Sequence, residues 1–128
     1  METLIIQISD LHFEHKQWER ELLFLEDELQ SFNNRLEELV ERWTHHSVLA
    51  QLEHYQNQFI RQHEIIDSLL HDINVHETDM FEHDKKGELA MNFNLAKKHF
   101  LLRERMETQR MIYHDLKREF FKFLSKHM

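Results

Sequence analysis

The chain has no proline among its 128 residues, and its only glycine is Gly87. Nothing therefore interrupts a helix between Val48 and His83, a stretch of about 36 residues. Apolar residues recur there at every seventh position: Leu52, Phe59, Ile66, Ile73 and Met80. A seven-residue repeat places such side chains along one face of a helix. A helix of this length needs apolar partners along the whole of that face, and the flanking segments must supply them.

Both flanking segments have the same periodicity. Apolar residues recur at steps of three and four from Leu11 to Trp43, and again from Leu95 to Leu124. Because the break at Thr44–Ser47 is short, the first two helices should be antiparallel neighbours. We expect helices at about 10–43, 47–85 and 90–127, the first capped by Ser9 or Asp10 and the second ended by Gly87. The sequence thus predicts one all-α domain, residues 1–128, folded as an elongated antiparallel three-helix bundle.

Some apolar residues lie away from these seams, including Phe93, Phe100 and Met111 in the third helix. One interpretation is that each helix touches two neighbours and needs a wide apolar arc. The other is that two copies associate into a larger bundle and cover these side chains. We expect a homodimer on this basis.

Composition excludes several classes of protein. The chain has no Cys for disulfide or thiolate chemistry, and it has no glycine-rich phosphate loop and no nucleophile elbow. The apolar stretch within its first ten residues is too short for a secretory signal, and no positively charged residue precedes it. No run approaches the roughly 20 apolar residues of a membrane span. We therefore expect a cytoplasmic protein, with no membrane partner and no predicted catalytic residue.

Charge is unevenly distributed along the chain. Residues 1–87 hold 7 basic and 19 acidic residues, whereas residues 88–128 hold 9 basic and 5 acidic ones. A basic third helix is a feature of some nucleic-acid-binding proteins. An acidic first helix can neutralise it within the molecule, and a net charge of −8 disfavours a phosphate backbone as partner. We expect no nucleic-acid partner.

The chain contains 12 His, and several of them fall at one level of the predicted bundle. Turns near residues 45 and 88 bring Glu14 and His15 beside His76 and Glu77, and these beside His99. On a helical wheel the two glutamates point near the centres of the apolar arcs and the histidines lie on the flanks. Imidazole and carboxylate donors together suit iron, manganese or zinc. Glu14, His15, His76, Glu77 and His99 are therefore predicted metal ligands.

An alternative for this level is a hydrogen-bonded cluster without metal, in which His and Glu satisfy each other at a wet bundle end. Lys98 is expected nearby and would repel a cation. A second set, His63, Asp67 and His71, is spaced for chelation along one helix, but the same spacing gives charge pairs on a solvated flank.

Four segments carry a resemblance to known sequences: LHFEHKQWERELLFLEDEL, NRLEEL, LEHYQNQFI and IIDSLLHDINVHE. They resemble a group of short, uncharacterised helical bacterial proteins over roughly residues 10–80. This resemblance implies a helical fold and no activity. A looser likeness to hemerythrin-like and ferritin-like bundles rests on His and Glu content alone, since those bundles have four helices and other spacings.

Two hypotheses from different classes follow. The first is a cytoplasmic, homo-oligomeric helical bundle that acts as an interaction or structural module, with a further protein partner as one possibility. The second is a metal-binding bundle, either mononuclear or dinuclear and redox-active, which holds Fe, Mn or Zn through the five predicted ligands. Metal content separates the two.

Overall fold

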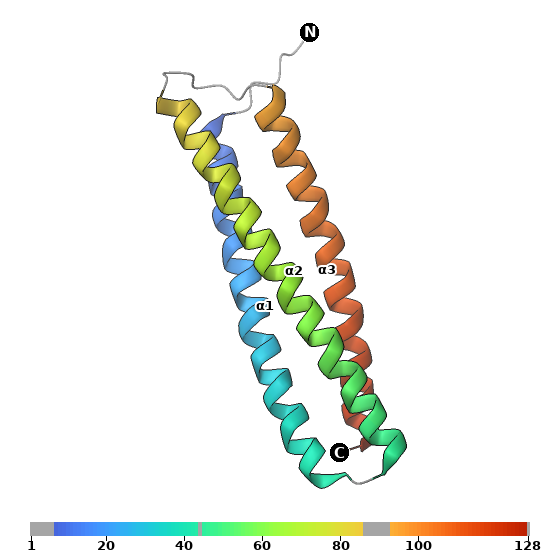
Figure 1. Cartoon of the computed structure of the whole chain (residues 1–128). Coiled ribbons are helices and arrows are strands. Elements are labelled where there is room, and N and C mark those ends of the chain that lie inside the picture. The colour runs from blue at the N-terminus through green and yellow to red at the C-terminus, as the bar shows by residue number, and fades with distance from the viewer. Residues whose placement is uncertain (1–6, 44, 86–92, 128) are drawn as a thin grey trace.

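A computed structural model describes residues 7–43, 45–85 and 93–127, which form three helices. These are α1 (Ile8–Arg42), α2 (His46–Lys85) and α3 (Phe93–His127). α1 and α3 run in the same direction, and α2 runs antiparallel to both (Figure 1). At 35, 40 and 35 residues, the helices are roughly 50–60 Å long at 1.5 Å per residue. The predicted all-α, elongated three-helix bundle is confirmed.

The helix ends differ from the prediction by a few residues. α1 begins at Ile8, and its N-cap is Gln7, whose backbone is extended (φ −86°, ψ 138°) and whose side chain makes no capping bond. The prediction that Ser9 or Asp10 caps this helix is wrong, because both lie inside its first turn. Asp10 still complements the positive end of the helix dipole from there. The predicted stop at Gly87 lies outside the described residues.

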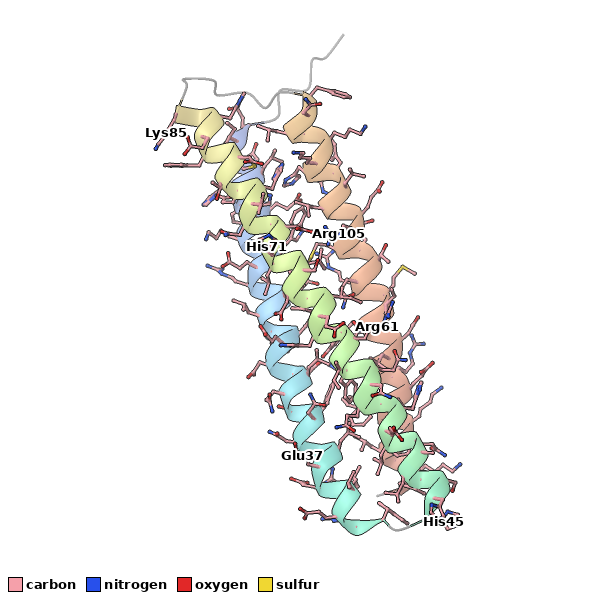
Figure 2. All side chains as sticks on the ribbon, viewed as in Figure 1. Glu37, His45, Arg61, His71, Lys85 and Arg105 are labelled. Atoms are coloured by element: carbon pink, nitrogen blue, oxygen red, sulfur yellow. The ribbon has the colours of Figure 1, made fainter. Side chains whose placement is uncertain are left out.

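The seven-residue repeat of α2 forms the centre of the core, as predicted. Leu52, Phe59, Ile66, Ile73 and Met80 are all at most 3 % exposed. In the half of the bundle near the α1–α2 turn, Phe59 meets aromatic rings from both neighbours. Its ring centroid is 4.9 Å from that of Phe120 on α3 and 5.6 Å from that of Phe32 on α1. Side chains from all three helices project into the space between the ribbons (Figure 2).

One polar pair interrupts this core midway along the bundle. Gln62 of α2 and Gln109 of α3 are buried, and the Gln109 amide donates a hydrogen bond to the Gln62 side-chain oxygen. Displacing either helix along its axis would leave a buried amide without a partner, which costs about 1–3 kcal/mol. The pair therefore favours one register of α3 against α2.

A ladder of ion pairs joins α1 to α3. Glu14 pairs with Arg103, Glu21 with Arg110 and Glu28 with Lys117. Each step advances seven residues in both helices, as expected for parallel helices that coil around each other. The acidic first helix therefore neutralises much of the basic third helix within the molecule, as predicted. None of the described helices combines the length and the low charge that a membrane span requires.

Candidate metal centre

Three histidines, one from each helix, meet near the end of the bundle where α1 starts, α2 ends and α3 starts (Figure 1). His15 precedes Trp18 by three residues in the core seam of α1. His76 lies between Ile73 and Met80 in that of α2, and His99 follows Leu95 by four residues in that of α3. Each histidine thus occupies a core position of its helix. His15, His76 and His99 are 1, 3 and 0 % exposed, respectively.

The three imidazoles converge on one point. His15 Nε2 lies 3.0 Å from His76 Nδ1 and 3.1 Å from His99 Nδ1. The ring centroids are 4.9–5.5 Å apart. Each histidine offers one ring nitrogen to a group whose members all lie within 4.8 Å of one another. We call His15 Nε2, His76 Nδ1 and His99 Nδ1 the inner nitrogens.

The other nitrogen of each ring bonds to an oxygen outside the cluster. His15 Nδ1 lies 2.6 Å from Glu77 Oε2, and His99 Nε2 lies 2.6 Å from Glu14 Oε1. His76 Nε2 lies 2.8 Å from the backbone oxygen of Leu95. Ionised carboxylates and carbonyl oxygens only accept hydrogen bonds, so these outer nitrogens must be the donors. In a neutral imidazole only one nitrogen carries a hydrogen. If the outer nitrogens carry the hydrogens, each inner nitrogen has a lone pair, and no hydrogen lies between the inner nitrogens.

Burial favours the neutral form of two of the imidazoles, those of His15 and His99. It lowers the pKa of His99 to about 4, although the hydrogen bond to Glu14 acts in the opposite direction. Burial also lowers the pKa of His15, against the hydrogen bond to Glu77. Burial therefore favours the uncharged form of His15 and of His99.

The two carboxylates remain ionised beside the cluster. Burial alone would raise the pKa of Glu14, but hydrogen bonds from Arg103 and His99 outweigh it, and the net shift is downward. The pKa of Glu77 is likewise lowered, because hydrogen bonds from His15 and His12 outweigh its burial. Two anions thus lie directly behind two of the three rings. This arrangement raises the basicity of the inner nitrogens and orients them, as outer partners do around metal-binding histidines.

All five residues predicted as metal ligands from the sequence lie together. The wheel, however, assigned the wrong residues to the interior: the histidines are buried, whereas the side chains of Glu14 and Glu77 are 32 and 29 % exposed. A wheel at 100° per residue drifts by about 20° per heptad against a supercoiled seam. Lys98, expected to oppose a cation here, is exposed and lines a hollow on the α2–α3 side.

Sequence reasoning missed several neighbours of the cluster. The Trp18 ring stacks on that of His99 at 4.9 Å. Arg103, four residues after His99, donates to Glu14 through Nε (3.1 Å) and Nη2 (2.7 Å). His12 Nδ1 bonds to Glu77 Oε1. The sequence did contain a signal for two of them. His12 lies three residues before His15 and Arg103 four residues after His99, and these spacings put each pair on one face of its helix.

Two hollows reach the cluster from the surface. One, of about 320 Å³, lies between α2 and α3, and His76 forms part of its wall. The other, of about 270 Å³, lies between α1 and α2 and reaches His15 and Glu77. The buried centre is therefore bordered by space for small molecules on two sides.

A second group of possible ligands lies on the surface. His63 is 3.6 Å from Glu26 and 3.4 Å from Asp67, and the side chains are 33–57 % exposed. These distances are those of solvated ion pairs, which contribute little at exposed positions. The group lacks the burial and the converging lone pairs of the three-histidine cluster.

Comparison with known proteins returned no relative: no family model, no curated protein and no solved structure matches the chain. The resemblance to uncharacterised helical bacterial proteins accordingly stays a prediction.

Proposed function

We propose that the protein binds one divalent transition-metal ion through His15, His76 and His99. The observation that carries the proposal is the set of three inner nitrogens. Each has a lone pair, because an oxygen acceptor keeps the hydrogen of the ring on the outer nitrogen. The lone pair of His15 Nε2 lies 3.0 and 3.1 Å from the other two inner nitrogens, and buried lone pairs this close repel one another unless something positive lies among them. Either a proton or a metal ion can fill that role.

A proton is the weaker explanation. A hydrogen between two inner nitrogens requires one ring to carry both of its hydrogens and a positive charge. Burial opposes that charge, as the pKa of about 4 at His99 indicates. A proton can also bridge only two of the three nitrogens, whereas a metal ion accepts all three.

The distances between inner nitrogens suit a metal ion. Metal–nitrogen bonds of about 2.1 Å separate neighbouring ligands by about 3.0 Å in an octahedron and about 3.4 Å in a tetrahedron. The observed separations of 3.0 and 3.1 Å lie near the octahedral value. Among Fe, Mn and Zn, three imidazoles and no thiolate favour Fe²⁺ and Zn²⁺, because Mn²⁺ prefers oxygen ligands. Glu14 and Glu77 support the ligands from behind.

Metal content tests the proposal directly. Protein purified without a His-tag or a metal column should contain about one equivalent of iron or zinc per chain, or take up one equivalent after dialysis against Fe²⁺ under anaerobic conditions or against Zn²⁺. Plasma emission spectrometry measures both. Metal well below a tenth of an equivalent before and after dialysis would exclude the site.

A second candidate function is a homo-oligomeric interaction module. Phe93, Phe100 and Met111 are 79, 44 and 68 % exposed, and spacings of 7 and 11 residues put them on one outer face of α3. A second copy of the chain is the simplest partner that would cover them. The proposal includes a cytoplasmic location, with which the absence of Cys agrees.

Light scattering tests the oligomer. The wild-type chain of 16.0 kDa should scatter as a dimer at tens of micromolar, and replacing Phe93 and Phe100 together with Gln should shift the mass toward the monomer, because the apolar contact is lost. Replacing the exposed Ile60 of α2 with Gln serves as the control and should leave the mass unchanged. A wild-type protein that is already monomeric at this concentration would rule out the dimer.

A further inference from the structure

Three imidazoles do not complete the coordination of a transition-metal ion. Zinc takes at least four ligands, and an octahedral ion takes six. The remaining ligands must be side chains near the cluster or molecules from solution. Glu14 and Glu77 are the two carboxylates in contact with the histidines.

Glu14 is held away from the inner nitrogens. Its Oε1 accepts three hydrogen bonds, from His99 Nε2 (2.6 Å), Arg103 Nη2 (2.7 Å) and Arg103 Nε (3.1 Å). The Arg103 guanidinium lies 5.1 Å from the centroid of the Phe100 ring, which restricts its position. A charge-assisted bond of this kind is among the stronger side-chain interactions. Coordination of a metal ion by Glu14 would require breaking it.

Glu77 is held in place by hydrogen bonds to two histidines. One of its oxygens accepts from His15 Nδ1, and the other bonds to His12. If Glu77 turned to the ion, the buried N–H of His15 would lose its acceptor, at a cost of about 1–3 kcal/mol. Both carboxylates are therefore retained outside the coordination sphere by their present partners.

The hollow between α2 and α3 borders one of the three proposed ligands, His76. Val75, Leu101 and Leu102 supply apolar walls, and His76 lies at its inner side. Two cationic side chains, Lys98 and Arg105, also line it. Arg105, labelled in Figure 2, is neutralised by Asp72 at 2.6 Å. Asp79 lines the hollow as well, so the two carboxylates balance the two cations and the entrance carries no net charge. A preference for small anions therefore comes from the divalent ion itself, because imidazoles coordinate a metal in their neutral form.

We propose that the bound ion keeps an open coordination position for a small anion, and that Arg103 is the positioning residue that keeps it open by holding Glu14 outside the coordination sphere. This inference rests on the proposed metal binding. Arg103 touches neither the ion nor the anion and acts through Glu14 alone.

Cobalt(II) and azide provide the test, because Co²⁺ substitutes at sites of this kind and its visible spectrum reports its ligands. Azide added to the Co²⁺-loaded wild type should change the visible absorption in a saturable way. In Arg103→Gln, Glu14 loses two of the three hydrogen bonds to its Oε1 and keeps only the one from His99, so coordination of the ion has to compete with that single bond. The Co²⁺ spectrum should then change before azide is added, and the affinity for azide should fall about tenfold or more.

Arg110→Gln is the matched control. Arg110 donates to Glu21 through the same two nitrogens one heptad further along the ladder, but to separate oxygens: Nε to Oε1 at 2.6 Å and Nη2 to Oε2 at 2.8 Å. This control should retain the wild-type affinity for azide. Adding Glu14→Gln to Arg103→Gln should restore azide binding, since an amide is a weaker ligand than a carboxylate. A purely structural role of Arg103 would give no such rescue. If Arg103→Gln does not fold, Arg103→Met, which keeps an unbranched aliphatic side chain at this position, takes its place.

The outcomes separate the two proposals. A wild type that takes up no Co²⁺, Fe²⁺ or Zn²⁺ would overturn the metal site itself. A wild type that binds Co²⁺ but shows no spectral response to azide would overturn the open position only. Equal azide affinity in Arg103→Gln and the wild type, or equal losses in Arg103→Gln and Arg110→Gln, would overturn the positioning role of Arg103.

Discussion

Zn²⁺ at a hundredfold excess over its dissociation constant should raise the free energy of unfolding of the metal-free protein by about 2.7 kcal/mol. The gain arises by mass action, because the folded state assembles the three inner nitrogens and the unfolded chain does not. His99→Gln should abolish the gain, since it removes one ligand while its amide can still reach Glu14. Urea denaturation with and without Zn²⁺, followed by circular dichroism, measures both proteins.

His54→Gln is the control for this comparison. His54 is exposed on α2, near its start and far from the centre, so its replacement should leave the Zn²⁺ response intact. Equal gains in His99→Gln and the wild type would mean that the ion binds elsewhere on this histidine-rich chain. An unchanged wild-type transition in Zn²⁺, Fe²⁺ and Mn²⁺ would identify the cluster as hydrogen-bonded only.

Glu77→Gln tests the outer position of this carboxylate. Because Glu77 accepts from His15 instead of pointing at the inner nitrogens, the amide can still accept that bond through its oxygen. Such outer changes typically weaken metal binding 10–100-fold without abolishing it. The same urea titrations with Zn²⁺ give the affinity. Complete loss of the Zn²⁺ response would instead make Glu77 a ligand, as the sequence alone predicted.

The level of the site was predictable because short connections fix how the helices align. The turn near residue 45 sets α1 against α2, so His15 had to fall beside His76. The sequence placed His99 at the same height by assuming a turn near residue 88, which lies outside the described residues, and the structure does bring the three rings together. The heptad of α2 likewise determined its buried residues. Both predictions depend on the backbone alone, whose rise per residue hardly varies.

Which side chains face inward was not predictable in the same way. An ideal helix drifts by about 20° per heptad against a seven-residue repeat, and a rotation of a few tens of degrees exchanges Glu14 for His15 at the interior. The bonds from Arg103 to Glu14 and from His12 to Glu77 depend further on side-chain rotamers. Sequence spacing restricts those rotamers but does not select among them.

Acidification should destabilise the metal-free protein by about 3 kcal/mol between pH 7 and 4 through His99 alone. The pKa of His99 is about 4 in the folded protein, because the ring is buried, against an ordinary value of 6.5. Between these values the unfolded chain binds a proton that the folded protein does not. The free energy of unfolding therefore decreases by about 1.4 kcal/mol for each unit by which the pH is lowered across this window. Urea denaturation at a series of pH values, with a chelator present, measures it.

Three other groups at the centre, His15, Glu14 and Glu77, act in the same direction. Burial also lowers the pKa of His15, so acid destabilises the fold through this ring too. Hydrogen bonds lower the pKa values of Glu14 and Glu77 against the effect of burial. Their contribution is present above the ordinary carboxyl pKa of 4.5 and is lost as pH falls through the lower folded values. The sequence alone suggested opposing effects, because a His–Glu pair was expected to raise the pKa of the histidine, but burial outweighs the pair at both His15 and His99.

His99→Gln isolates the contribution of this ring from the eleven other histidines of the chain. Glutamine does not titrate, so the variant should lose less stability than the wild type between pH 7 and 4. In the middle of that range, the slopes of the free energy of unfolding against pH should differ between the two proteins by close to one proton. His54→Gln, exposed on the surface of α2, should keep the wild-type slope. Parallel pH profiles for His99→Gln and the wild type would mean that His99 titrates alike in the folded and unfolded states. Burial would then not hold this ring in its neutral form.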